Sequence, residues 1–107
     1  MPRFLAVYTM KPEDLASFRN LPKAEQDAVD EWSAWEERNA ASIPDPGGMV
    51  GKTTRMTKEG VVNAVNSFCG YLVIEGESAD AAARLFEHHP HMTVFPGDGV
   101  DIMPFLT

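Results

Sequence analysis

The chain has 107 residues, of which 44% are hydrophobic and 23% charged, the balance of one soluble globular domain with a modest core; we expect a single domain over residues 1–107. Nine Lys and Arg residues stand against 16 Asp and Glu residues, which gives a formal net charge of −7. Such an acidic chain repels phosphate groups, so neither nucleic acid nor a membrane surface is expected as a partner.

Cysteine usage and the first apolar run bear on the location of the protein. Cys69 is the only cysteine, so no internal disulfide can form and a cytoplasmic location is expected. We interpret Cys69 as a small buried hydrophobe. The apolar run of residues 4–10 is too short for a signal-peptide core with its cleavage site, or for a membrane span. It therefore predicts a buried strand.

The first third of the chain predicts a central strand followed by helices. Residues 3–10 (RFLAVYTM) are apolar on both faces, which is typical of a strand covered on both sides. Pro12 followed by two acidic residues predicts the first turn of a short helix. Residues 21–43 predict the main helix, since apolar residues recur at three- and four-residue spacing; they are Leu21, Ala24, Ala28, Trp32 and Trp35. We expect both tryptophans to be core residues rather than ligand-stacking residues.

The middle of the chain predicts two strands. Residues 44–48 (PDPGG) are a breaker run that ends the helical region. Residues 49–57 alternate in character and predict a strand with Arg55 near its middle, and residues 58–66 are interpreted as a connector. Residues 67–76 (SFCGYLVIEG) predict the second strongly apolar strand.

The last third predicts a capped helix and a final strand. Ser78 is the expected N-cap, the buried stripe would run from Ala81 to Phe86, and Pro90 would end the helix. Residues 100–106 (VDIMPFL) predict the last strand. Because Pro104 cannot donate a backbone hydrogen bond, that strand is expected at a sheet edge.

The order of these elements is β-α-β-β-α-β, the split arrangement of a ferredoxin-like subunit. The predicted fold class is α+β, with a four-stranded antiparallel sheet and two helices on one face. The first and third strands carry apolar residues toward both faces, so a monomer would expose an apolar sheet face. We therefore expect a homodimer through the open sheet face, in which two sheets form a dimeric α/β barrel.

Several stretches together resemble a known family. They are RFLAVY (3–8), EWSAWEE (31–37), GKTTRMTKEGV (51–61), GYLVIEGESADAAARLFEHHPHM (70–92) and VDIMPFL (100–106). This pattern resembles the YCII-related family of small dimeric α/β-barrel proteins, which implies a ferredoxin-like subunit with a cleft between sheet and helices. Some members resemble lyases or dehydrochlorinases of chlorinated aromatic compounds that use a His-Asp pair, with the His in the N-terminal half. No histidine precedes His88 in this sequence.

Residues 86–92 (FEHHPHM) hold all three histidines. Pro90 moves His89 out of the α region, which makes His88 the last helical residue in this interpretation. His89 lies three residues after Phe86, so its ring continues the apolar stripe of the helix. The spacing of the three histidines matches no recurrent zinc ligand set, and we predict no metal site and no cofactor.

Two interpretations of the histidines stay open. In the first, His88 and His91 cap and solvate a helix end while His89 packs in the core. In the second, His91 or His89 is a catalytic general acid or base, because a histidine titrates near neutral pH. A helix C-terminus favours the charged ring and burial favours the neutral ring, so the sequence leaves the protonation state undecided.

Four further polar residues are candidates for ligand binding. Arg55 could pair with a carboxylate or phenolate through its planar guanidinium, or could be a solubilising surface residue. Tyr8 and Tyr71 offer hydroxyls on central strands, or are core rings. Asp101 could partner Arg55 or a histidine at the start of the last strand.

Three functional hypotheses follow from these residues. The first is a cytoplasmic homodimer that binds a small organic ligand in a cleft formed by Arg55, Tyr8 and the histidine segment. The second is an enzyme of the lyase or isomerase type, in which a histidine moves a proton on an aromatic or enol substrate. The third is an interaction module whose cleft is closed.

Overall fold

The computed structural model describes residues 1–18 and 24–107, with side chains described outside residues 16–29. Its elements are β1 (Arg3–Thr9), α1 (Pro12–Phe18), α2 (Ala24–Arg38), the 3-10 turn η1 (Ala40–Ser42), β2 (Asp45–Met49), β3 (Thr53–Thr57), β4 (Gly60–Ala64), β5 (Phe68–Glu75), α3 (Ala79–Arg84), α4 (Pro90–Thr93) and β6 (Gly99–Pro104). Among the described residues, no helix combines the length and the apolar character needed to cross a membrane.

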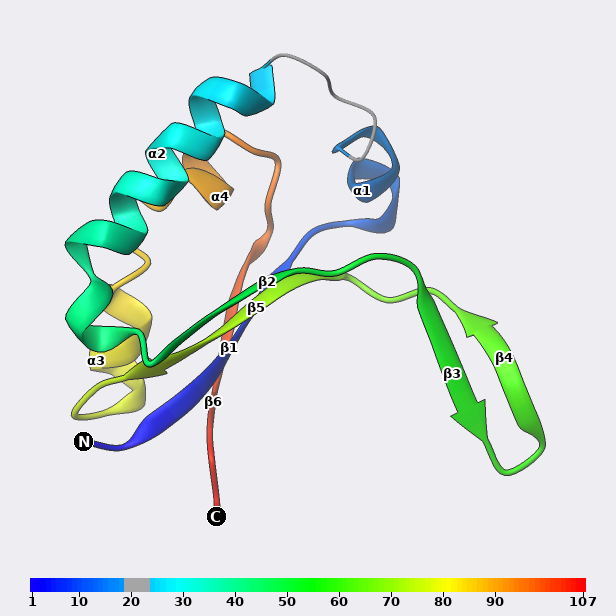
Figure 1. Ribbon diagram of the computed structural model, residues 1–107. Coiled ribbons are helices and arrows are strands. Elements are labelled where there is room, and N and C mark those ends of the chain that lie inside the picture. The colour runs from blue at the N-terminus through cyan, green and yellow to red at the C-terminus, as the bar shows by residue number, and fades with distance from the viewer. Residues whose placement is uncertain (19–23) are drawn as a thin grey trace.

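Four strands form one antiparallel sheet in the order β2-β5-β1-β6 (Figure 1). The two strongly apolar strands predicted from the sequence, β1 and β5, are its centre. β6 is an edge strand, as the proline at position 104 predicts. The predicted fold class is confirmed: the chain is α+β, with a four-stranded antiparallel sheet and its helices packed on one face.

The register of the sheet decides which side chains meet the helices. Phe4 and Ala6 of β1 lie opposite Ile74 and Leu72 of β5, and all four side chains are buried. Alternation along the strands sends their neighbours to the other face of the sheet. The buried core consists of Phe4, Ala6, Tyr8, Met10, Leu15, Trp35, Cys69, Leu72, Ile74, Ala82, Phe86 and Phe95.

Both tryptophans pack in the core, as predicted, but Trp35 is more deeply buried than Trp32. Trp35 is 3% exposed, and its indole Nε1–H donates to the Leu85 carbonyl at 2.9 Å, which ties α2 to the end of α3. Trp32 is partly buried and packs against the same core. Leu21 lies outside the described residues, as do the side chains of Ala24 and Ala28.

The predicted boundaries in the middle of the chain were wrong. The supposed breaker run is strand β2, which pairs with β5 at the sheet edge through a register shift. Gly47 allows this pairing: its φ is +59°, and a Cβ there would overlap the Tyr71 carbonyl group. The supposed second strand and connector are instead β3 and β4, a separate two-stranded hairpin.

The histidine segment also differs from the prediction. α3 begins at the expected N-cap, where the Ser78 hydroxyl accepts from the Ala81 N–H at 3.1 Å, but it ends at Arg84. His88 has a φ of 61° and is therefore not helical. Pro90 does not merely stop a helix, since it is the first residue of α4. A proline can occupy that position because the first N–H of a helix has no intrahelical partner.

Candidate functional site

Two of the three histidines lie inside the protein beside aromatic rings. The His89 side chain is 0% exposed, with ring centroids 4.5 Å from Trp32 and 4.4 Å from Trp35. Tyr8 completes the group, at 5.2 Å from the His89 ring. We call these four residues the aromatic cluster. It joins β1, α2 and the N-terminus of α4, three segments that are far apart in the sequence.

Both ring nitrogens of His89 have hydrogen-bond partners. Nδ1 accepts the backbone N–H of His91 at 2.9 Å, which caps α4, and Nε2 lies 3.2 Å from the Tyr8 hydroxyl oxygen. Because Nδ1 accepts, a neutral His89 must carry its hydrogen on Nε2. His89 therefore donates to the Tyr8 oxygen, and the Tyr8 hydroxyl hydrogen is left to point elsewhere.

The surroundings keep His89 neutral. Burial, which disfavours the imidazolium, and to a lesser extent the nearby His91 together lower the pKa of His89 to about 3. A ring with that pKa is a weak base. Since its Nε2 already carries a hydrogen toward Tyr8, His89 is arranged to hold the tyrosine rather than to remove its proton.

His91 is buried as well, at 1% exposure, so the predicted solvated position for this residue was wrong. Its Nε2 lies 2.8 Å from the Thr9 carbonyl oxygen and donates to it, which anchors α4 to the end of β1. Burial lowers the pKa of His91, and hydrogen bonds with the backbone of Thr9 and Gly99 partly oppose this effect. The buried position follows from α4, which turns the residue after Pro90 inward.

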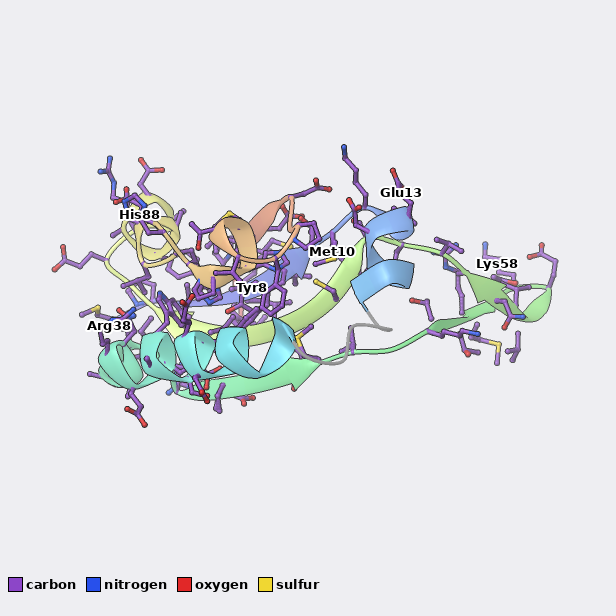
Figure 2. The ribbon with its side chains drawn as sticks, turned by 90° about the horizontal axis from the view of Figure 1, so that it is seen from above. Tyr8, Met10, Glu13, Arg38, Lys58 and His88 are labelled. Atoms are coloured by element: carbon purple, nitrogen blue, oxygen red, sulfur yellow. The ribbon has the colours of Figure 1, made fainter. Side chains whose placement is uncertain are left out.

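Tyr8 is kept as a neutral phenol. Burial raises its pKa, and the Glu36 carboxylate and Cys69 raise it further. The hydroxyl is thus a hydrogen-bond donor at any pH the protein meets. Figure 2 shows Tyr8 between the helical layer and the strands, in the interior of the molecule.

A cavity of about 410 Å³ has Tyr8 in its lining. Its walls come from β1, α2, β5 and the glycine-rich strand β2. The described residues that line it are Tyr8, Trp32, Ser33, Glu36, Pro46, Gly47, Gly48, Met49 and Tyr71. The volume lies within the range of small-molecule sites, roughly 300 to 1,000 Å³. Among the described lining residues Glu36 is the only charged one, and the lining also includes the Tyr8 phenol and the Trp32 indole.

The residues predicted to bind a ligand are only partly brought together. Tyr8 lines the cavity, with His89 directly behind it. Tyr71 contributes to the wall at the β2–β5 seam, where it pairs with Gly48, yet strand alternation places it and Asp101 on the sheet face of Val7. Asp101 is exposed there.

Arg55 does not join this cleft. It lies on β3 in the separate hairpin, opposite Val62, and is exposed. Figure 2 shows Lys58, at the turn of the same hairpin, at the opposite end of the molecule from the helices that enclose Tyr8. The expectation of one cleft containing Arg55, Tyr8 and the histidines was therefore wrong in the placement of Arg55.

Sequence reasoning missed the cavity-lining roles of Glu36, Trp32 and the β2 glycines. Glu36 was hidden in the acidic run EWSAWEE, where it follows the buried Trp35 by one residue. A usable signal was its four-residue spacing from Trp32, which puts both side chains on one face of α2. Among the described residues, no group of three or more His, Cys, Asp or Glu side chains is arranged to hold a metal ion.

The fold of this chain is similar to that of a solved structure. No protein-family model and no curated protein matches the chain. The solved structure of 5-chloro-2-hydroxyhydroquinone dehydrochlorinase (TftG) from Burkholderia phenoliruptrix AC1100, in complex with 2,5-dihydroxybenzoquinone, is similar with a TM-score of 0.61 and 19% sequence identity. The similarity covers 96% of this chain and 92% of that chain. At this identity it shows a shared fold, and a fold alone assigns no reaction.

Proposed function

We propose that the protein is a cytoplasmic homodimer of the YCII-related kind, formed by one domain over residues 1–107, which binds a small ring compound in the cavity beneath α2. The observation that carries the proposal is that Tyr8 lines the cavity while its hydroxyl oxygen accepts from His89, which leaves the hydroxyl hydrogen available to a ligand. A ligand carbonyl or hydroxyl oxygen would accept that hydrogen.

The remaining lining narrows the ligand class. Glu36 would accept a hydrogen bond from a ligand hydroxyl, and Trp32 offers an aromatic wall. Because Glu36 is the only charged residue among the described residues of the lining, the cavity favours neutral over anionic ligands. The TftG structure, whose ligand is a dihydroxybenzoquinone, supports a ring compound with ring oxygens as the first class to test.

The homodimer is supported by the uncovered sheet face. Strand alternation places Leu5, Val7, Val73 and Met103 on the face away from the helices. Met103 is 42% exposed, and Phe105 directly after β6 is 49% exposed. Pairing two such faces would cover these side chains.

The test is a binding titration with two probes that differ in charge. Hydroquinone is neutral at pH 7 and should bind more tightly than 2,5-dihydroxybenzoquinone, which ionises readily. Quenching of tryptophan fluorescence should report hydroquinone binding in the wild type, and Tyr8→Phe should weaken it by about tenfold, the effect of one lost hydrogen bond. Tyr71→Phe is the control and should bind like the wild type, because strand alternation directs the Tyr71 side chain to the other face of the sheet. Equal affinity of the wild type and Tyr8→Phe would refute the proposed role of Tyr8.

A second function, an enzyme of the lyase or isomerase type, is favoured by a specific pairing in the cavity. Glu36 and Tyr8 line the same space, one as a carboxylate base and the other as a neutral acid. Glu36 would remove a C–H proton next to a ligand carbonyl while Tyr8 donates to the carbonyl oxygen that gains charge. In this scheme His89 is a positioning residue that acts through Tyr8, and His91 anchors α4 behind it.

Enzymatic proton transfer is tested by isotope exchange. A neutral ring ketone such as cyclohexanone, whose C–H exchange in buffer is slow, would be incubated in D₂O, and loss of the C–H signals next to its carbonyl followed by NMR. The wild type should accelerate exchange above buffer, and Glu36→Gln should abolish the acceleration. Exchange that persists in Glu36→Gln would exclude Glu36 as the base. Glu37→Gln, one position along α2, is the matched control.

A further inference from the structure

The β3–β4 hairpin stands apart from the rest of the molecule. We call residues 51–66 the arm. Among the elements of the described chain, β3 and β4 make their extensive contacts only with each other, and Figure 1 shows them projecting from the end of the sheet. An isolated two-stranded hairpin is at best marginally stable in water. Among the described residues, the arm therefore lacks the extensive packing partner that such a structure needs.

The arm also differs in charge from the body that carries it. It contains Lys52, Arg55 and Lys58 against Glu59, a formal charge of +2. Because the whole chain carries −7, the other residues carry −9. Helix α2 alone contains six acidic residues and one basic residue, and its Asp30, Glu31 and Glu37 are exposed. The arm is thus a cationic segment on a strongly acidic protein.

One face of the arm is apolar at its outer end. Met56 and Val61 are cross-strand partners, exposed by 73% and 62%. Such pairs stabilise a sheet by packing against each other and against a covering surface. Here nothing in the described part of the same chain covers them.

The exposed area of the whole chain points to a partner of substantial size. The accessible surface is 7154 Å² for a chain of 11.8 kDa. A compact monomer of this mass exposes roughly 5,900 Å². The surplus of roughly 1,200 Å² exceeds the area of about 800 Å² that each partner contributes to a standard interface.

We propose that the arm docks on a second copy of this chain, with its cationic side chains against the exposed acids of the partner's α2 and with Met56 and Val61 covered there. The same chain offers both the cationic arm and the acidic surface, so a twofold axis would form two identical contacts and close the assembly. The proposal rests on the homodimer proposed above and adds to it a contact outside the sheet faces.

Charge reversal in the arm tests this contact on the full chain. The dissociation constant of the dimer would be measured by analytical ultracentrifugation for Arg55→Glu/Lys58→Glu. The control is Lys11→Glu/Arg84→Glu, which changes the net charge equally at exposed positions outside the arm. We expect the arm variant to weaken the dimer about tenfold or more relative to the control. Equal dissociation constants would overturn the arm contact while the sheet-face dimer stands.

Crosslinking locates the contact. Carbodiimide treatment of a mixture of ¹⁴N- and ¹⁵N-labelled protein joins lysines to touching carboxylates, and mass spectrometry separates links between copies from links within one copy. We expect mixed-isotope links from Lys52 or Lys58 to the acids of α2. If Lys52 and Lys58 formed crosslinks only to carboxylates of their own copy, the proposal would be overturned. A monomer at all concentrations would refute both the arm contact and the homodimer, whereas hydroquinone binding tests the cavity separately.

Discussion

Tyr8 connects the interior of the protein to the cavity. Its oxygen accepts from His89 Nε2, and both groups are buried. Tyr8→Phe should lower the free energy of unfolding by about 1 to 3 kcal/mol, the usual cost of leaving a buried donor unsatisfied. Urea denaturation measures this loss. Tyr71→Phe, at a residue 39% exposed, should change the value by no more than about 0.5 kcal/mol. Equal losses in the two variants would contradict the hydrogen bond.

His88, unlike the buried Tyr8, is exposed, and its backbone is strained. A φ of 61° is unfavourable for a residue with a Cβ and natural for glycine. His88→Gly should therefore raise the free energy of unfolding, by up to about 1 kcal/mol after the extra freedom of glycine in the unfolded chain is counted. Thermal denaturation checks this. A lower melting temperature would show that the His88 side chain makes a contact worth more than the strain.

In the histidine segment, the burial of one histidine was predictable from its spacing in the sequence and the burial of another was not. The three-residue spacing from Phe86 correctly predicted that His89 packs inside. The burial of His91 is not predictable from the local sequence. Proline can end one helix or begin the next, and here it begins α4. The partner of His91, the Thr9 carbonyl, lies 82 positions away in the sequence.

At the scale of elements, α4 packs tightly against the turn before β6. Gly97 donates its N–H to the His91 carbonyl at 3.0 Å, and a Cβ at Gly97 would overlap the His91 ring and carbonyl. Gly97→Ala should cost about 1 to 3 kcal/mol, as overpacking does. Gly99→Ala is the matched control, because a Cβ there meets no atom within 4 Å. Similar stabilities of the two variants, measured by chemical denaturation, would contradict the tight fit at Gly97.

The elements themselves were predictable where the hydrophobic pattern is strong. β1, β5 and the Ser78-capped helix were located correctly from periodicity and capping. β2 was not, because two glycines and a proline oppose strand formation locally, and pairing with β5 outweighs that preference. The error propagated to Arg55, since a second sheet strand placed at residues 49–57 would have carried it into the main sheet.

At the scale of the whole molecule, the buried histidines couple stability to pH. The pKa of His89 is about 3 in the folded protein, against about 6.5 in the unfolded chain. Between these values the unfolded state binds more protons, so the free energy of unfolding falls as the pH drops below 6.5. One such histidine contributes a slope of up to about 1.4 kcal/mol per pH unit, and the lowered pKa of His91 acts in the same direction.

Denaturation of the wild type and His89→Phe between pH 6.5 and 5 measures the contribution of His89. The variant keeps an aromatic ring in the cluster but has no group to protonate there. Its slope with pH should be shallower than that of the wild type. Parallel slopes would mean that His89 is protonated in the folded protein, contrary to its buried neutral position.

The homodimer is an inference from the hydrophobic pattern of the sequence alone. Apolar residues on both faces of β1 and β5 imply that each face of the sheet is covered, and the register places apolar side chains on the face away from the helices. The cavity could not be inferred in this way. It is formed by α2 and β2 meeting over Tyr8, and neither the register of β2 nor the direction of the Tyr8 hydroxyl is encoded in a local pattern.

The central claim is that His89 donates to Tyr8 and leaves the Tyr8 hydrogen for a ligand in the cavity. A long-range ¹H–¹⁵N correlation spectrum of the histidine rings, recorded at pH 7 and pH 5, tests this directly. We expect His89 to carry its hydrogen on Nε2, with a bare Nδ1, at both pH values. A hydrogen on Nδ1 at either pH, in the other tautomer or in the imidazolium, would contradict the account.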